Sequence, residues 1–92
     1  RTTSSPVVAL NHAAALAMSE GFERGLSVME SAGNSGALDN YYLFHASRAD
    51  LLRRLNRMDE AVAAYQLALT LTTNSVEQNY IRGRLRSISA SI

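Results

Sequence analysis

The 92-residue sequence contains no cysteine, no tryptophan and no lysine, and it has a single proline. Without cysteine it can form no disulfide and has no thiolate for catalysis or metal binding, which fits a reducing compartment such as the cytoplasm. No stretch approaches the ~18 consecutive apolar residues of a membrane helix, and no signal-peptide pattern opens the chain. These absences exclude a disulfide framework and predict no membrane-spanning segment.

Charge is sparse and almost balanced, with 18% charged residues and a net charge of +1. A balance this close to zero excludes the strong positive field of a domain built to bind nucleic acid. The charge is unevenly placed, because residues 1–36 hold two Arg and three Glu, whereas residues 75–92 hold three Arg and one Glu. The C-terminal arginines alternate with other residues, so on a helix they spread over more than one face. They predict a solvated or interdomain surface: Arg82, Arg84 and Arg86.

A unit recurs in the chain at a spacing of 36 residues. Small residues fall opposite small residues, and large apolar residues fall opposite large ones. In the first unit Ala13, Leu16, Gly25, Leu26, Met29 and Ala32 correspond to Ala49, Leu52, Ala61, Val62, Tyr65 and Ala68 in the second. A period in this range indicates stacked helix–turn–helix units, and such repeats usually bind other proteins. We expect the small residues to let the helices of each hairpin approach closely.

The hydrophobic spacing predicts an all-α fold of five helices and no strand. We expect two helical hairpins, at about 6–33 and 39–73, and a capping helix at about 75–91, in one domain spanning residues 1–92. Gly21 and Asn56 mark the turns inside the hairpins. Asp39 is predicted to cap the third helix, and Ser75 with Gln78 to form a capping box for the fifth.

The core of so short a chain is thin, because folding hides only about 60–65% of the unfolded surface. Two units are also fewer than the roughly three that repeat folds usually need. We therefore expect the core to be completed by the capping helix, by a homodimer or by a neighbouring domain. Since the sequence begins at Arg1 rather than at Met, we expect a fragment of a longer chain. Ile88 and Ile92 are expected to form an exposed apolar end that docks on another surface.

The second unit resembles a tetratricopeptide repeat (TPR). The segment 59–69 matches the second helix of that family closely, and Ala49 takes the small-residue position of its first helix. His45 stands where the family has a bulky aromatic residue, and Thr73 where it has a closing proline. The first unit departs further, since Gly25 replaces the family's Ala. The resemblance implies degenerate TPR-like hairpins in an α–α superhelix.

A narrower resemblance covers nearly the whole chain, from Ser5 to about Leu85. It rests on three segments: 5–11, Leu43-Phe44-His45-Ala46-Ser47-Arg48-Ala49-Asp50-Leu51-Leu52-Arg53-Arg54-Leu55, and Asp59-Glu60-Ala61. These segments are similar to the C-terminal extension of one group of extracytoplasmic-function (ECF) RNA polymerase sigma factors, in which a TPR-like domain follows the two promoter-binding regions. The resemblance implies that the partners are the upstream sigma regions of the same chain and RNA polymerase or a regulatory protein. It implies no direct DNA contact by this segment.

No arrangement of residues in the sequence predicts catalysis, a cofactor or a metal. His12 and His45 have no partner at metal-ligand spacing, and neither a Ser–His–Asp order nor a phosphate-binding glycine loop is present. We interpret His45 as a buried histidine with one hydrogen bond, and His12 as a surface or inter-helix residue. Arg48 interrupts an apolar face, so it needs a partner if it is buried. Asp59 or Glu60 is the expected carboxylate.

Five residues form the candidate interaction surface: Asn11, Met18, Asp50, Arg53 and Arg54. The three on the third helix occupy the side that lines the groove in TPR-like stacks, and Asn11 resembles a groove Asn that binds peptide backbone in some TPR proteins. A merely solvated face is the alternative reading.

Three functions follow from these patterns. The first is an interaction and regulatory module at the C-terminal end of an ECF-type sigma factor, which modulates transcription initiation by RNA polymerase. The second is a stand-alone TPR adaptor that binds a peptide or partner protein in its groove. The third is an enzyme, which we set aside because the sequence contains no catalytic set of residues.

Overall fold

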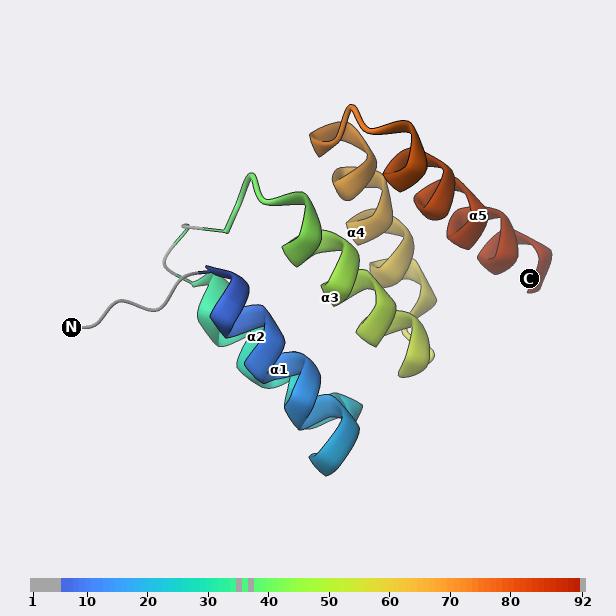
Figure 1. The fold of residues 1–92 in the computed structure, drawn as a ribbon. Helices are drawn as coiled ribbons and strands as arrows, with labels where there is room; N and C mark the ends of the chain where they lie inside the picture. Colours follow the sequence, from blue (N-terminus) through green and yellow to red (C-terminus); the bar gives the residue numbers. More distant parts are fainter. Residues whose placement is uncertain (1–5, 35, 37, 92) are drawn as a thin grey trace.

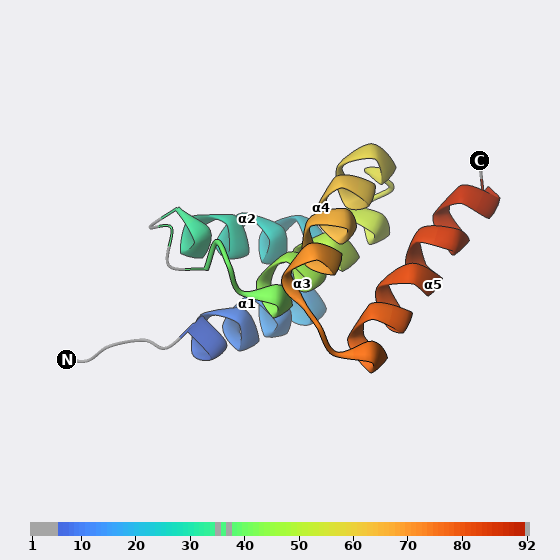
Figure 2. The same ribbon diagram turned by 90° about the horizontal axis from the view of Figure 1, so that it is seen from above.

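Five helices make up the computed structural model, which describes residues 6–34, 36 and 38–91 (Figure 1). They are α1 (Pro6–Glu20), α2 (Phe22–Gly33), α3 (Tyr42–Arg54), α4 (Met58–Leu71) and α5 (Ser75–Ser91). α1 and α2 form one antiparallel hairpin, α3 and α4 form a second, and α5 packs on α4 at the C-terminal end (Figures 1 and 2). The predicted all-α fold of two helical hairpins and a fifth helix is confirmed.

Residues with positive φ close both hairpins. Gly21, between α1 and α2, has a φ of 105°, in a region that glycine adopts without steric cost. Asn56, after α3, has a φ of 63°, and asparagine is one of the few other residues that tolerate it. The backbone N–H groups of Asn56 and Arg57 donate to the carbonyls of Arg53 and Leu52, which is the Schellman pattern of a helix end. The turns predicted at Gly21 and Asn56 are confirmed.

Small residues bring the two helices of each hairpin into contact. A Cβ placed on Gly25 of α2 would lie 2.5 Å from the Cβ of Ala17 and 2.9 Å from the carbonyl oxygen of Ala13. The first hairpin is therefore too close at this point for any side chain. The small residues of the second hairpin are fully buried: Ala49, Ala61 and Ala68. The predicted role of small residues holds at these positions, whereas Ala32 is only half-buried.

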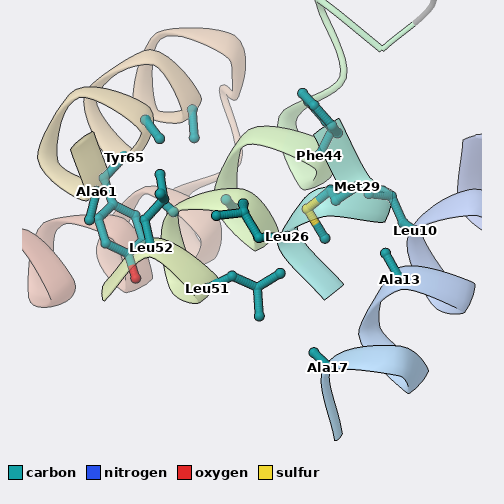
Figure 3. Packing of buried hydrophobic residues seen from close by; sticks show 14 of the residues in the cluster. Leu10, Ala13, Ala17, Leu26, Met29, Phe44, Leu51, Leu52, Ala61 and Tyr65 are labelled. Carbon is teal, nitrogen blue, oxygen red and sulfur yellow. The ribbon is translucent and has the colours of Figure 1, made fainter. Parts of the chain in front are cut away.

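The hydrophobic core runs along the stack from α1 to α5. Its largest fully buried side chains are Leu26, Met29, Leu38, Leu52, Tyr65 and Ile81. Met29 lies between α1 and α3, and Tyr65 extends from α4 beside Leu52 of α3 (Figure 3). Phe44 and Leu51 are also buried on α3, so this helix is covered on two sides.

The start of α3 differs from the prediction. The residue before the helix is Tyr41, which makes no side-chain capping bond, and Asp39 lies in the preceding turn. The predicted Asp39 cap is therefore wrong. Asp39 contributes through its backbone instead, because its carbonyl oxygen lies 2.7 Å from Nε2 of His45.

The start of α5 differs as well. Asn74 caps the helix, since its Oδ1 accepts the backbone N–H groups of residues 76 and 77 at 2.8 and 3.1 Å. The predicted capping box of Ser75 and Gln78 is wrong, because the Gln78 amide donates to the carbonyl of Thr72. Asparagine bonds the free N–H groups of a first helical turn at least as well as serine, and its position one residue earlier gives it the correct reach.

The apolar residues of α5 divide between core and surface. Ile81 and Ile88 are 0% and 2% exposed, whereas Val76 is 75% exposed. The predicted exposed apolar end at Ile88 is therefore wrong, because Ile88 belongs to the core cluster. Ile92 lies outside the described residues. With these two isoleucines α5 covers α4 and extends the core at the C-terminal end of the stack.

Candidate interaction surface

A hollow of about 190 Å³ lies where the first hairpin meets α3. Its apolar lining comes from three helices: Ala14, Ala17, Met18, Phe22, Met29 and Leu51. Ser47, Asp50 and Arg54 of α3 add a polar side. Most small-molecule pockets enclose roughly 300–1,000 Å³, so this hollow suits a single apolar side chain of a partner better than a whole small molecule.

Three of the five predicted surface residues meet at this hollow: Met18, Asp50 and Arg54. Met18 is 80% exposed on α1. Arg54 is exposed at the end of α3, with its guanidinium carbon 5.3 Å from the centre of the Phe22 ring. This cation–π contact positions the Arg54 charge beside the apolar lining.

The other two predicted residues are placed differently. Asn11 is exposed on α1 but does not line the hollow. Arg53 is half-buried on α3, and its Nε lies 3.3 Å from the hydroxyl oxygen of Tyr65. Arg53 therefore belongs to a polar cluster next to the hollow rather than to its lining.

That polar cluster joins α3, α4 and α5 through the Asp50 carboxylate. Oδ1 of Asp50 accepts the hydroxyl proton of Tyr65, and Oδ2 accepts that of Tyr80 at 2.8 Å. Each tyrosine oxygen in turn accepts an N–H from an arginine at 3.3 Å, Tyr65 from Arg53 and Tyr80 from Arg84. The Asp50 charge is thus engaged by two hydroxyl groups on its two oxygens.

The Tyr65 hydroxyl is held in its protonated form by these surroundings. Burial raises the pKa of Tyr65, because the charged phenolate would lose its hydration, and the hydrogen bond to Asp50 raises it further. The bond from Arg53 acts in the opposite direction and is outweighed. Tyr65 consequently donates its proton to Asp50 over the whole physiological pH range.

Sequence reasoning missed Tyr80 as a member of this cluster, and it assigned Asp50 and Arg53 to the interaction surface without connecting them to Tyr65. A signal for the cluster existed at Tyr65. A tyrosine on the buried stripe of a helix needs a partner for its hydroxyl, and Asp50 lies on the neighbouring helix of the same hairpin. Tyr80 lies 30 residues after Asp50 in the sequence. Its hydrogen bond to Asp50 depends on how α5 packs against the other helices.

Arg48 forms an ion pair between the two hairpins, and not between the two helices of its own hairpin. Its Nη2 lies 2.9 Å from Oε2 of Glu30 on α2, and its Nε donates to the same oxygen at 3.0 Å. The predicted partners Asp59 and Glu60 are therefore wrong, because Arg48 faces the preceding hairpin. Glu60 pairs instead with Arg57 at 2.8 Å.

The histidines have the roles that the sequence predicted. His45 is 8% exposed, with one hydrogen bond at Nε2 and an edge contact to the Phe44 ring at 5.0 Å between centroids. His12 is exposed on α1. Among the described residues no three His, Asp or Glu side chains are grouped closely enough to hold a metal ion. Over the same residues, no helix has the length and apolarity to cross a membrane.

The chain is similar to an uncharacterized protein of Rhizobium meliloti (strain 1021), which is 40% identical to it over 90 residues. The aligned segment is 98% of this chain but 21% of the relative, so the chain spans about a fifth of the relative's length. No family model matches the chain, and no solved structure matches it.

Proposed function

We propose that this helical domain is an interaction and regulatory module of a longer cytoplasmic chain, equivalent to the C-terminal domain of an ECF-type sigma factor. The module binds the upstream sigma regions or a regulatory protein, and it modulates transcription initiation by RNA polymerase through binding energy. The proposal gives the domain no catalytic role and no direct contact with DNA.

The hollow between the first hairpin and α3 carries the proposal. Met18 and Arg54 project there without being needed for the packing of the core, since both are exposed. An apolar recess with a charged residue beside it is typical of a surface that receives one side chain of a partner.

Two further observations support a place in a longer regulatory chain. The segment with the most specific resemblance, 43–55, contains nearly all of α3, which packs against α1, α2 and α4 and bonds to α5 through Asp50. The similar protein of Rhizobium meliloti is also about five times as long as the aligned segment.

The coding sequence upstream of Arg1 provides the first test. The proposal predicts a helix-turn-helix region and a polymerase-binding region there, and a coding sequence without them would contradict it. Regulation is then measured as the rate of transcription initiation by RNA polymerase. The full-length chain is compared with a chain from which residues 1–92 have been removed. We expect the initiation rate to differ between the two chains.

A TPR-type adaptor that binds a peptide is the second candidate, and the same hollow favours it. Replacing both Arg53 and Arg54 with Ala should then abolish binding of a peptide selected from a library. Selection of no peptide by the intact domain would count against the adaptor function.

A further inference from the structure

The arginines of the described residues fall into two groups. Arg24, Arg48 and Arg57 each lie within 3.5 Å of a glutamate, respectively Glu20, Glu30 and Glu60. The other five have no carboxylate oxygen within 4.0 Å among the described residues: Arg53, Arg54, Arg82, Arg84 and Arg86. All five come from α3 and α5, so the positive charge without a partner is concentrated on that part of the stack.

Three of these five arginines lie beside the hollow or in the adjoining polar cluster. Arg54 lines the hollow, and Arg53 and Arg84 donate Nε to the two tyrosines that bond Asp50. Asp50 is the one acid among them, and hydroxyl protons already occupy both of its oxygens. The guanidinium groups are thus fixed in place while their charge lacks a carboxylate.

We propose that this surface, consisting of the hollow and Arg53, Arg54 and Arg84, binds an acidic segment of a partner protein that places one apolar side chain in the hollow. The inference rests on the proposed interaction function and names the chemistry of the partner. Complementary charge speeds association and selects against basic partners, and the apolar side chain supplies the burial that an exposed ion pair alone does not.

A nucleic acid fits this surface less well than an acidic peptide. The hollow has an apolar lining from six side chains, which a phosphate backbone cannot use. Asp50 is bonded to the same two tyrosines as Arg53 and Arg84, so it opposes a continuous row of phosphates there. An acidic peptide can offset this cost by placing an apolar side chain in the hollow, which a phosphate backbone does not have. Arg82 and Arg86 border a separate depression whose lining residues all come from α5, so no second helix helps to enclose a ligand there.

Peptide display against the immobilised 92-residue chain tests the predicted chemistry. We expect the selected peptides to contain more Asp and Glu than Lys and Arg, together with at least one large apolar residue. Selection of basic or purely polar peptides, or of no peptide, would overturn the inference. A labelled single-stranded DNA serves as a competing probe, and tighter binding of this DNA than of the best acidic peptide would also overturn it.

Fluorescence anisotropy of one selected peptide then locates the site. We expect Arg54→Glu to weaken binding by about tenfold and Met18→Ser to weaken it by roughly threefold. The matched control is Arg82→Glu, which changes the net charge equally at the separate α5 depression and should alter affinity by less than about twofold. Equal losses for Arg54→Glu and Arg82→Glu would show non-specific attraction and contradict the proposed surface.

Two controls keep these outcomes interpretable. The two substituted arginines, Arg54 and Arg82, are exposed, so neither substitution should unfold the domain. Helical circular dichroism with a urea unfolding curve verifies that the variants are folded. If Arg54→Glu is unfolded, Arg54→Gln removes the charge with less change of size. Sedimentation of the chain alone measures self-association. If the chain forms a dimer that dissociates in Arg54→Glu, the surface binds a second copy of the chain, and the inference of an acidic partner protein is wrong.

A change of transcription by the full-length chain, with no acidic peptide bound, would refute this inference and leave the proposed function standing.

Discussion

At the scale of single residues, Tyr65 couples the core to the candidate surface. Its side chain is fully buried among the helices, and its hydroxyl group bonds Asp50 and Arg53, two half-buried residues of α3. The ring thereby fills the core while its oxygen orients two of the residues that sequence reasoning assigned to the interaction surface. A change at Tyr65 should affect both stability and the geometry of those charges.

Removal of the Tyr65 hydroxyl should destabilise the domain measurably. In Tyr65→Phe the ring still fills the core, but Asp50 and Arg53 each lose a partner, so we expect a loss of about 1–3 kcal/mol in the free energy of unfolding. Urea denaturation measures this loss. Tyr41→Phe is the control, because Tyr41 is half-buried and its hydroxyl makes no hydrogen bond to the residues that the structure describes. Equal losses for the two variants would contradict the role given to the Tyr65 hydroxyl.

Alkaline pH should destabilise the domain through the same residue. The pKa of Tyr65 is raised in the folded state above its ordinary value of 10.0, so the unfolded chain releases this proton first. The contribution of protonated Tyr65 to the free energy of unfolding is fully present below pH 10. It is lost as pH rises further, by up to about 1.4 kcal/mol per pH unit. Because lysine is absent, tyrosines are the side chains that titrate in this range.

Thermal unfolding between pH 9 and pH 12 measures this dependence. The stability of Tyr65→Phe should fall less steeply above pH 10 than that of the natural chain. Parallel slopes for the two proteins would show that Tyr65 is not the residue responsible. Burial also raises the pKa of Tyr42, so part of the slope should remain in the variant.

At the scale of helices, close approach decides where the hairpins tolerate a larger residue. Gly25→Ala should overpack the contact of α2 with α1, because the new Cβ would meet the Cβ of Ala17 at 2.5 Å and backbone at 2.9 Å. We expect destabilisation of about 1–3 kcal/mol. Gly83→Ala is the matched control, since its added Cβ would meet no other helix and no side chain beyond its chain neighbours within 4 Å.

The control substitution, Gly83→Ala, should change the free energy of unfolding in the opposite direction. Alanine is favoured over glycine inside a helix by about 0.5–1 kcal/mol, so Gly83→Ala in α5 should stabilise the domain. Urea denaturation of both variants separates the two effects. Stabilisation by Gly25→Ala as well would mean that the first hairpin is not packed as closely as the structure has it.

The helix cap of α5 provides another test at this scale. Asn74→Ala removes the oxygen that accepts two backbone N–H groups, and we expect a loss of about 1 kcal/mol. Ser75→Ala should change the free energy of unfolding by less than about 0.5 kcal/mol. A larger loss for Ser75→Ala than for Asn74→Ala in urea denaturation would contradict the Asn74 cap and support the capping box that the sequence predicted.

The sequence allowed the helices and their turns to be predicted because local patterns determine them. Helical spacing of apolar residues defines each helix, and Gly21 and Asn56 occur where positive φ is needed. The partner of Arg48 could not be predicted, because Glu30 belongs to the other hairpin. The pairing of Arg48 with Glu30 is set by how far the second hairpin turns relative to the first.

At the scale of the whole molecule, equivalent positions of the two hairpins differ in exposure. Val8 of α1 is 59% exposed, whereas Phe44, which lies 36 residues later on α3, is 7% exposed. The difference arises because the first hairpin covers Phe44, whose ring lies against Gly33 of α2. The hollow of the candidate surface lies where α1, α2 and α3 come together. The sequence identified three of the residues that line the hollow but not the hollow itself, which exists only once the hairpins are stacked.

Methyl NMR on the three methionines tests most directly whether this surface binds a partner. Met18 is at the opening of the hollow and Met29 lines it, whereas Met58 begins α4 outside it. Titration of methyl-labelled protein with a selected acidic peptide should shift the Met18 and Met29 signals and leave Met58 unchanged. A shift at Met58 alone, or no shift at Met18 with peptide bound, would contradict the proposed binding surface.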